Sequence, residues 1–452
     1  MEQATLPRPA PSGVASMPPG SRAPAIVQGV RYMRDPLGFL SGLRERYGDV
    51  FSVSFPYFGR IVYVASPELV KAVFTGSPAI FHAGEANATV LEPALGPNSV
   101  LSLDDEPHMQ QRKLLLPPFH GERIRRYGDL IREVTRREMD TWPVGRPFAL
   151  RPHTQKITLT VILRAVFGIE DQRRVERATH LIDVFSDRVT LITKFPNLRR
   201  DLGPFSPWRR FLRARAALDE FIYEEIALRR AEAGGEERDD VLSLLLRARH
   251  DDGTPMSDEE LRDELLTVVG AGHETTATAL AWAMERLLRT PRVLARLRES
   301  IAAGEDDYLE ATVKETLRMR PVIIDVARRL TEPARIAGYQ LPARSFVLPA
   351  IGAVHFRPDL FPQPHEFRPE RFLDGKVENY AWIPFGGGVR RCIGAAFAEY
   401  EMRIVLREFV GRAELSAPDP RPEKVRIRNI TLAPARGTTV RLERALTAPT
   451  RA

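Results

Sequence analysis

The chain has 452 residues but only one cysteine, so it cannot form an internal disulfide. It has no apolar run of about 18 residues, the length that a membrane-spanning helix requires. No basic segment followed by an apolar one marks a signal peptide at the N-terminus. No Pro-, Ser- or Gly-rich linker interrupts the interior. Together these absences predict a cytoplasmic protein without a membrane anchor.

The net charge of +7 raises the question of nucleic-acid binding. The arginines are spread along the chain, however, and no nucleic-acid recognition motif accompanies them. We therefore interpret the excess as solvated surface and expect no nucleic-acid partner. Hydrophobic residues make up 43% of the chain, which is enough to build a large core.

Prolines are concentrated in the first 24 residues, which we predict to form an extended, poorly ordered tail. The prolines that carry this prediction are Pro7, Pro9, Pro11, Pro18, Pro19 and Pro24.

The single cysteine, Cys392, lies in the glycine-rich stretch FGGGVRRCIG, which precedes a helix-forming segment. Three consecutive glycines allow the backbone to fold tightly beneath a large flat ligand. Arg390, Arg391 and the helix N-terminus at Gly394 favour a negative sulfur, so we expect a thiolate. A small buried hydrophobe is the other interpretation of a lone cysteine. A phosphate-binding loop is excluded, because no Gly-Lys-Ser/Thr follows.

A thiolate held in this way suits an axial ligand of haem iron. The spacing F-x-x-G-x-R-x-C-x-G is filled by Phe385, Gly388, Arg390, Cys392 and Gly394. It resembles the haem-binding loop of the cytochrome P450 family. The resemblance implies a mainly α fold with a small β region, one catalytic domain over residues 25–445, and haem b as the cofactor. Cys392 is the implied iron ligand, and the other four residues are implied to bind the cofactor.

A long helix is predicted over residues 257–290, opened by a capping box of Ser257 and Glu260. Its middle reads GAGHETT, and two glycines inside a helix cost roughly 1 kcal/mol each relative to alanine. Such a cost indicates that a ligand approaches the helix closely at this point.

Glu274 and Thr275 in this stretch supply an acid and an alcohol that can pass protons. The stretch resembles the oxygen-activation segment of the family, so these two residues are the implied catalytic ones and Ala271 is an implied pocket residue. A zinc-protease motif would need a second histidine at position 277, which is Ala277.

His108 and Arg112 lie four residues apart on a predicted helix and therefore share a face. Taken alone, such a pair is most often a solvated face. The family resemblance implies that they bind the haem propionates together with Arg328 and Arg390.

Glu315 and Arg318 stand three apart on a predicted helix, and Arg371 follows in a Pro-Glu-Arg-Phe segment. The two segments resemble the E-x-x-R and P-E-R-F elements of the family. The resemblance implies a buried, structural network that braces the cysteine loop.

The sequence gives less information about the residues around the substrate than about those around the cofactor. Residues 77–103 predict a loop-rich segment, and two amphipathic stretches in 170–235 are implied to form a lid. Ile324 and Asp325 lie in an apolar run that the resemblance places on the pocket wall. Asp325 is either a structural acid paired with backbone, Arg328 or Arg329, or an anchor for a hydroxyl or amine of the substrate.

The resemblance implies a monomeric monooxygenase that inserts one oxygen atom from O2 into a C–H or C=C bond. The expected substrate is a lipophilic small molecule, with fatty acids, terpenoids, steroids and polyketides left open. Electrons are expected from an acidic ferredoxin or flavodoxin with an NAD(P)H-dependent reductase. A peroxide-driven peroxygenase, a haem-thiolate isomerase, and a haem-based sensor or electron carrier are the alternatives.

Overall fold

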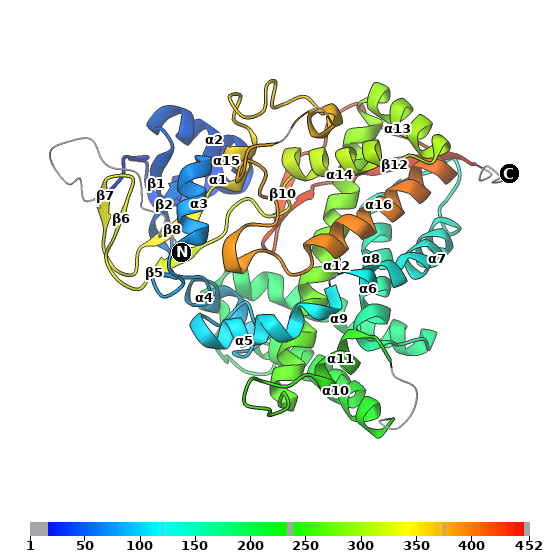
Figure 1. Cartoon of the computed structure of the whole chain (residues 1–452), viewed down its shortest axis with the longest axis horizontal. Coiled ribbons are helices and arrows are strands. Elements are labelled where there is room, and N and C mark those ends of the chain that lie inside the picture. Colours follow the sequence, from blue (N-terminus) through cyan, green and yellow to red (C-terminus); the bar gives the residue numbers. More distant parts are fainter. Residues whose placement is uncertain (1–16, 120, 233–237, 374, 376, 447–452) are drawn as a thin grey trace.

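The computed structural model describes residues 17–119, 121–232, 238–373, 375 and 377–446. Helices fill most of the molecule, and a small sheet lies at one side (Figure 1). The helix α12 (Asp258–Leu288) runs through the middle of the helical part. This arrangement confirms the predicted mainly α fold with a small β region.

The remaining helices follow in chain order. They are α1 (Ala25–Arg34), α2 (Pro36–Tyr47), α3 (Pro67–Thr75), α4 (Gly84–Leu95), α5 (Asp105–Leu115), η1 (Pro117–Phe119), α6 (Glu122–Arg126), α7 (Gly128–Met139), α8 (Leu150–Phe167), α9 (Gln172–Lys194), η2 (Pro196–Leu198), α10 (Pro207–Ala231), α11 (Val241–Arg247), α13 (Pro291–Ala303), α14 (Asp307–Met319), α15 (Ile351–His355), η3 (Pro369–Phe372), η4 (Gly388–Arg390) and α16 (Ala395–Arg412).

The strands form four small sheets in the described part of the chain. The largest has the order β1-β2-β8-β5-β3, in which only β2 and β8 are parallel. The other sheets are β10-β11, β4-β12-β9 and β6-β7. The bounds are β1 (Val50–Phe55), β2 (Gly59–Val64), β3 (Phe81–His82), β4 (Pro147–Ala149), β5 (Arg328–Leu330), β6 (Ala334–Ile336), β7 (Tyr339–Leu341), β8 (Phe346–Pro349), β9 (Ala413–Ser416), β10 (Val425–Arg428), β11 (Thr431–Pro434) and β12 (Thr439–Ala445).

The central helix α12 begins with the predicted capping box. Ser257 Oγ accepts a hydrogen bond from the Glu260 backbone N–H at 3.1 Å, and the Glu260 carboxylate accepts one from the Ser257 N–H at 2.8 Å. The helix packs against α8, where Thr154 and Thr158 donate from their hydroxyls to α12 carbonyls, each at 2.9 Å. These bonds fix the middle of α12, which carries Glu274 and Thr275, against a second helix.

The N-terminal segment differs from the prediction. Ser52 N–H of β1 donates to Pro19 O at 2.8 Å, and Arg60 of β2 donates to Pro18 O at 2.9 Å. Gly20 also forms a parallel bridge with Ser52. The prediction of a poorly ordered tail over 1–24 is therefore wrong for residues 17–24, while residues 1–16 lie outside the described part.

The region 77–103 is also more regular than its composition predicts, because it contains α4. The Asp104 carboxylate accepts hydrogen bonds from the backbone N–H groups of Ala83, Gly84 and Glu85 at 2.9, 2.8 and 2.7 Å. An N-cap is normally supplied by a residue directly before the helix. Here it comes from a residue about 20 positions later, which the local sequence does not reveal.

None of the described helices is long and apolar enough to cross a lipid bilayer. The cytoplasmic location stays a prediction.

Glu401 on α16 is a buried carboxyl group in the core of the helical part. Its side chain is 2% exposed, and Oε1 has no hydrogen-bond partner among the described residues. Burial raises the pKa of Glu401 to about 8. Between its ordinary pKa and this value the folded state holds a proton that the unfolded state releases, so this group makes stability fall as pH rises.

We therefore expect Glu401→Gln to reduce the decline in melting temperature between pH 5 and pH 9. At the alkaline end the variant should be more stable than the wild type, by about 1.4 kcal/mol for each unit by which burial raises the pKa of Glu401. Glu259→Gln, an exposed change on α12, is the control. Parallel curves for the wild type and both variants would show that Glu401 is already ionised at neutral pH.

Candidate functional site

The cysteine loop is held against α3 by a glycine. Gly388 has φ +64°, and a Cβ atom at this position would lie 1.9 Å from the Phe74 carbonyl oxygen. Cys392 N–H donates to Phe385 O at 3.0 Å, which closes the loop before α16 begins after Gly394. Only glycine fits at Gly388, because both the left-handed backbone and the close approach exclude a side chain.

Cys392 keeps accessible surface although it lies deep among protein atoms, so a ligand can reach its sulfur. Burial raises the pKa of the Cys392 thiol, while the Gly394 N–H, Arg391 and Arg112 lower it. Among the protein's own groups burial outweighs these charges, so the expected thiolate depends on a coordinated metal ion. A coordinated metal ion would deprotonate the sulfur.

The face of α12 that carries the glycines is open. Gly270 and Ala271 are exposed although they lie at the centre of the helix, between the buried residues Val269 and His273. Thr275 stands one turn further along and donates from its hydroxyl to Ala271 O at 2.7 Å. An open strip in the middle of a buried helix indicates a space for a ligand.

Glu274 is turned to α8. Its carboxylate is 9% exposed and contacts the Arg151 guanidinium, and it accepts a hydrogen bond from Gln155 Nε2 at 3.0 Å. Arg428 lies 3.7 Å from the same carboxylate. Two cations therefore lie at this carboxylate, at the edge of the open strip.

Four basic side chains form a basic cluster, which consists of His108, Arg112, Arg328 and Arg390. Burial and the three arginines lower the pKa of His108 to about 3, so the histidine is neutral. Burial also lowers the pKa of Arg328 and of Arg390 to about 10. Asp104, which pairs with Arg390, is the one carboxylate bound to the cluster among the described residues.

The Arg112 side chain has neither a hydrogen bond nor an ion pair with any described residue. The cluster therefore carries more positive charge than its own surroundings neutralise. A cavity of about 310 Å³ opens on one side of the cluster, where His108, Arg328 and Arg390 line it together with the acidic residues Asp104, Asp105 and Glu106. This excess of buried positive charge suits a ligand with two carboxylates.

These features fit haem b. An accessible thiol, a helix face without bulky side chains and a cluster of unneutralised cations match the iron, the flat ring and the two propionates of the cofactor. Cys392, Ala271 and Thr275 each keep accessible surface, and Arg390 of the basic cluster stands two residues before Cys392.

The structure also brings together Glu315, Arg318 and Arg371. Arg318 donates to both oxygens of the Glu315 carboxylate at 2.7 and 2.9 Å, and Arg371 Nε donates at 3.2 Å. Glu315 and Arg318 are fully buried. This network was expected from the two sequence segments.

The network continues to the cysteine loop through His355, which the sequence did not indicate. Arg318 donates to His355 O at 2.8 Å, and the ring nitrogen Nε2 of His355 accepts from Ile383 N–H at 2.9 Å. Burial and the nearby Arg318 lower the pKa of His355 to about 3, which keeps the ring neutral and able to accept. Ile383 stands two residues before Phe385, where the loop begins.

Asp325 does not pair with Arg328 or Arg329. Its Oδ2 atom accepts hydrogen bonds from Tyr32 OH and Tyr63 OH, both at 3.1 Å. The prediction of an arginine partner is therefore wrong, because both arginines lie in β5 and have partners elsewhere. Tyr32 and Tyr63 are more than 250 positions away in the sequence, so local reasoning could not find them.

Ile324 is 3% exposed and packs toward Gly352 of α15 rather than lining an open space. Its side chain thus belongs to the core.

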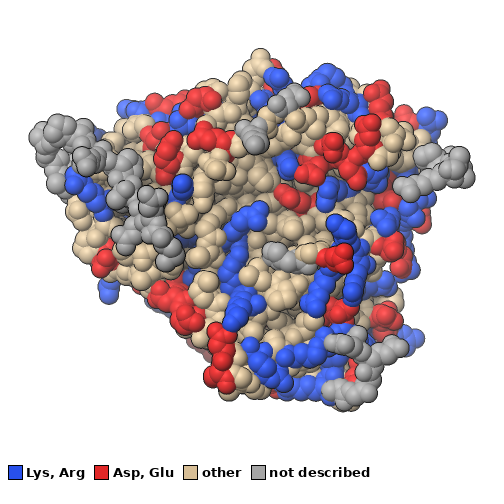
Figure 2. Space-filling model, viewed as in Figure 1, with Lys and Arg blue, Asp and Glu red and all other residues tan. Residues whose placement is uncertain are grey.

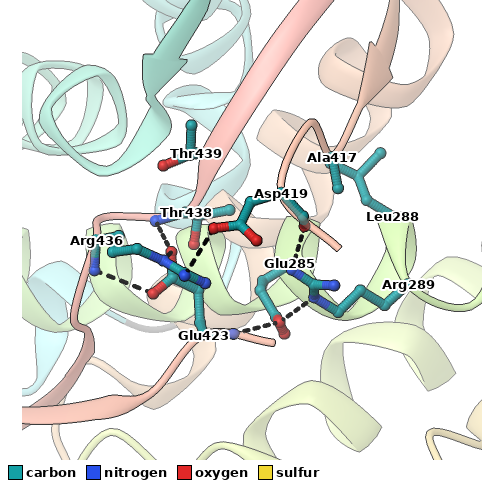
Figure 3. Close-up of a pocket in the computed structure, with 9 residues that line it drawn as sticks. All are labelled: Glu285, Leu288, Arg289, Ala417, Asp419, Glu423, Arg436, Thr438 and Thr439. Carbon is teal, nitrogen blue, oxygen red and sulfur yellow. Dashed lines mark hydrogen bonds and ion pairs between the residues drawn. The ribbon is translucent and has the colours of Figure 1, made fainter. Parts of the chain in front are cut away.

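A second cavity, near the end of α12, is not a candidate site (Figure 3). It encloses about 10 Å³, which is at most one water molecule. Hydrogen bonds join α12 to the C-terminal segment beside it, since the Glu285 carboxylate accepts from Glu423 N–H at 3.2 Å and Arg289 donates to Asp419 O at 3.1 Å. The side chains that line it are Glu285, Leu288, Arg289, Ala417, Asp419, Glu423, Arg436, Thr438 and Thr439.

Comparisons with known proteins identify the family of the chain. A family model described as Cytochrome P450 matches residues 17–440. "Putative cytochrome P450 135B1" of Mycobacterium bovis is 42% identical over 443 residues, which cover 95% of this chain and 93% of that protein. "Putative cytochrome P450 138" of the same species is 38% identical over 445 residues, with coverage of 98% and 100%.

Among solved structures, the retinoic acid bound cyanobacterial CYP120A1 has a TM-score of 0.83 and 24% identity, and the match covers 96% of this chain and 100% of that chain. This likeness shows the fold. The family match and the two relatives show more, since they extend over nearly the whole sequence. The chain therefore belongs to the cytochrome P450 family and is a haem-thiolate monooxygenase.

Proposed function

We propose that this monooxygenase inserts one oxygen atom from O2 into a C–H or C=C bond of a lipophilic small molecule, with electrons from an external redox partner. The observation that carries the proposal is the open strip of α12, where Ala271 and Thr275 keep accessible surface in the middle of a buried helix. The acid and the alcohol expected of an O2-using enzyme are both present. A sensor or an electron carrier would not need them.

Haem, when bound, supplies the activation of dioxygen and the transfer of one oxygen atom. Cys392 would hold the iron through its sulfur, and the basic cluster would hold the propionates. Phe385, Gly388 and Gly394 shape the loop that presents the sulfur, and the network of Glu315, Arg318 and Arg371 fixes the loop from behind.

Thr275 and Glu274 handle protons in this proposal. The Thr275 hydroxyl donates its proton to Ala271 O. Its lone pairs are therefore free to accept a hydrogen bond from a molecule at the open strip. Glu274 is held by Arg151 and Gln155, so it can take up a proton only when this pairing loosens. Arg151 is thus a positioning residue that the sequence did not indicate.

The redox partner is proposed to be an acidic ferredoxin or flavodoxin. Figure 2 shows basic side chains gathered near the middle of one face, over α5 and the loop before α16, with acidic side chains toward the rim. A partner of opposite charge would be steered to this face, close to the cysteine loop.

Cys392→Ser tests the iron ligand. We expect the variant to lose the absorption band of the reduced CO complex at the wavelength that names the family, because an alcohol donates less electron density than a thiolate. The measurement is the CO difference spectrum at matched haem content. Survival of the band would show that another residue holds the iron.

Arg112→Gln tests the basic cluster. Loss of one charge-assisted hydrogen bond, worth about 1.5–3 kcal/mol, should weaken haem binding by tenfold or more. Haem transfer to apomyoglobin measures the effect. Arg132→Gln on α7 is the matched control, since Arg132 pairs at the surface with Asp129. Equal rates of haem release from the two variants would show that Arg112 does not bind the haem.

Thr275→Ala tests proton handling. We expect near-normal haem content and substrate binding, but at least about tenfold less product per NAD(P)H, with the missing electrons recovered as hydrogen peroxide. The neighbouring buried residue Thr276 offers the control Thr276→Ala. Unchanged coupling in Thr275→Ala would refute the assigned role.

A further inference from the structure

Tyr32, Tyr63 and Asp325 form a polar cluster from three distant parts of the chain. Tyr32 lies on α1, Tyr63 on β2, and Asp325 in the segment between α14 and β5. Both hydroxyls donate to the same atom, Asp325 Oδ2, at 3.1 Å. The other carboxyl oxygen accepts no hydrogen bond from a described residue, and Asp325 keeps partial exposure. Tyr63 is 1% exposed, so Tyr32 and Asp325 carry the accessible surface of the cluster, which offers acceptor atoms and no free donor.

No cation neutralises this carboxyl group within the described part of the chain. Arg328 donates to Ala327 O and lies over the Phe74 ring, and Arg329 pairs with Glu85 at 3.0 Å. Burial raises the pKa of Asp325 and the two tyrosines lower it, without a contribution from any basic residue. Buried carboxylates in proteins are normally paired with a positive group.

The surroundings of the cluster are aromatic. The ring of Tyr32 meets the rings of Phe39 and Phe55 edge-on at 6.3 and 5.1 Å, and Tyr63 stacks on Phe51 at 5.5 Å. An apolar shell strengthens the attraction between opposite charges, and aromatic faces attract cations.

The segment that carries Asp325 is fixed at both ends. At its start, Val322 O accepts from Leu432 N–H at 2.9 Å, and Leu432 O accepts from Trp282 of α12 at 2.7 Å. At its end, Arg328 belongs to the basic cluster. The chain from α14 to β5 thus passes from the central helix to the small sheet (Figure 1).

We infer that the cluster of Tyr32, Tyr63 and Asp325 binds the ammonium group of a lipophilic amine, and that this monooxygenase prefers cationic substrates to fatty acids. The inference rests on the proposed function. An ammonium group donates three hydrogen bonds and carries the charge that the cluster lacks, whereas a carboxylate would face three acceptor oxygens and a like charge.

The test compares three ligands with the same chain: decylamine, decanol and decanoate, with haem-loaded protein at pH 7, where the amine is protonated. Equilibrium dialysis gives the dissociation constants. The haem spectrum reports where the nitrogen lies, because an amine that reaches the iron produces a low-spin shift. We expect decylamine to bind at least about tenfold more tightly than decanol or decanoate, without the low-spin shift.

Asp325→Asn should abolish the preference and leave decanol binding within about twofold of the wild type, because the amide keeps the shape but not the charge. Tyr32→Phe, which removes the oxygen of the partly exposed tyrosine, should reduce the preference and serves if the first variant does not fold. Asp219→Asn is the control, since Asp219 is a half-buried carboxylate on α10 beside Arg262.

Equal affinity for the three ligands in the wild type, a low-spin shift with decylamine, or a preference that persists in Asp325→Asn would overturn the inference. These outcomes leave the proposed function intact if the CO spectrum and NAD(P)H-dependent oxidation are normal. Failure of the proposed function appears in those two measurements instead, and dialysis still reports the charge preference.

Discussion

The buried ion pair between Glu315 and Arg318 is the interaction on which the site depends. Both side chains are fully buried, and the pair is bidentate. Removing one partner of such a pair leaves an unpaired buried charge and typically costs about 3–5 kcal/mol. Here the consequence extends beyond stability, because Arg318 also holds His355, and His355 holds the backbone just before the cysteine loop.

The rigidity that results has a chemical reason. A thiol in this position has its pKa raised by burial, so local charges do not keep it as an anion. A metal ion must do so, and a metal ion selects the sulfur only if the loop presents it in one place. Two features hold the loop in one place. Gly388 packs closely against the Phe74 backbone, and the Glu315 network supports the loop from behind.

The sequence predicted the parts of the site whose chemistry is local. The cysteine loop, the acid and alcohol of α12 and the segment of Glu315 could be recognised, since each lies in a short stretch with fixed spacing. It could not predict partners that only the fold brings near, such as Arg151 for Glu274 or the two tyrosines for Asp325.

The same limit explains the errors in the fold. The helix α4 is capped from Asp104, and residues 17–24 are bound through Ser52 and Arg60. In both places the stabilising group is distant in sequence, so composition alone suggested a loop and a free tail. Proline-rich composition disfavours helix, but it does not exclude an extended segment laid along a strand.

The carboxylates of Glu274 and Asp325 have different electrostatic surroundings. The Glu274 carboxylate contacts Arg151 and lies 3.7 Å from Arg428, so its negative charge is paired with cations of the protein itself. Asp325 has two hydroxyls and no cation. A charge that is already paired within the protein does not need a ligand to neutralise it. A charge that is not neutralised is available to a ligand, and this difference separates a residue that serves the reaction from one that selects the substrate.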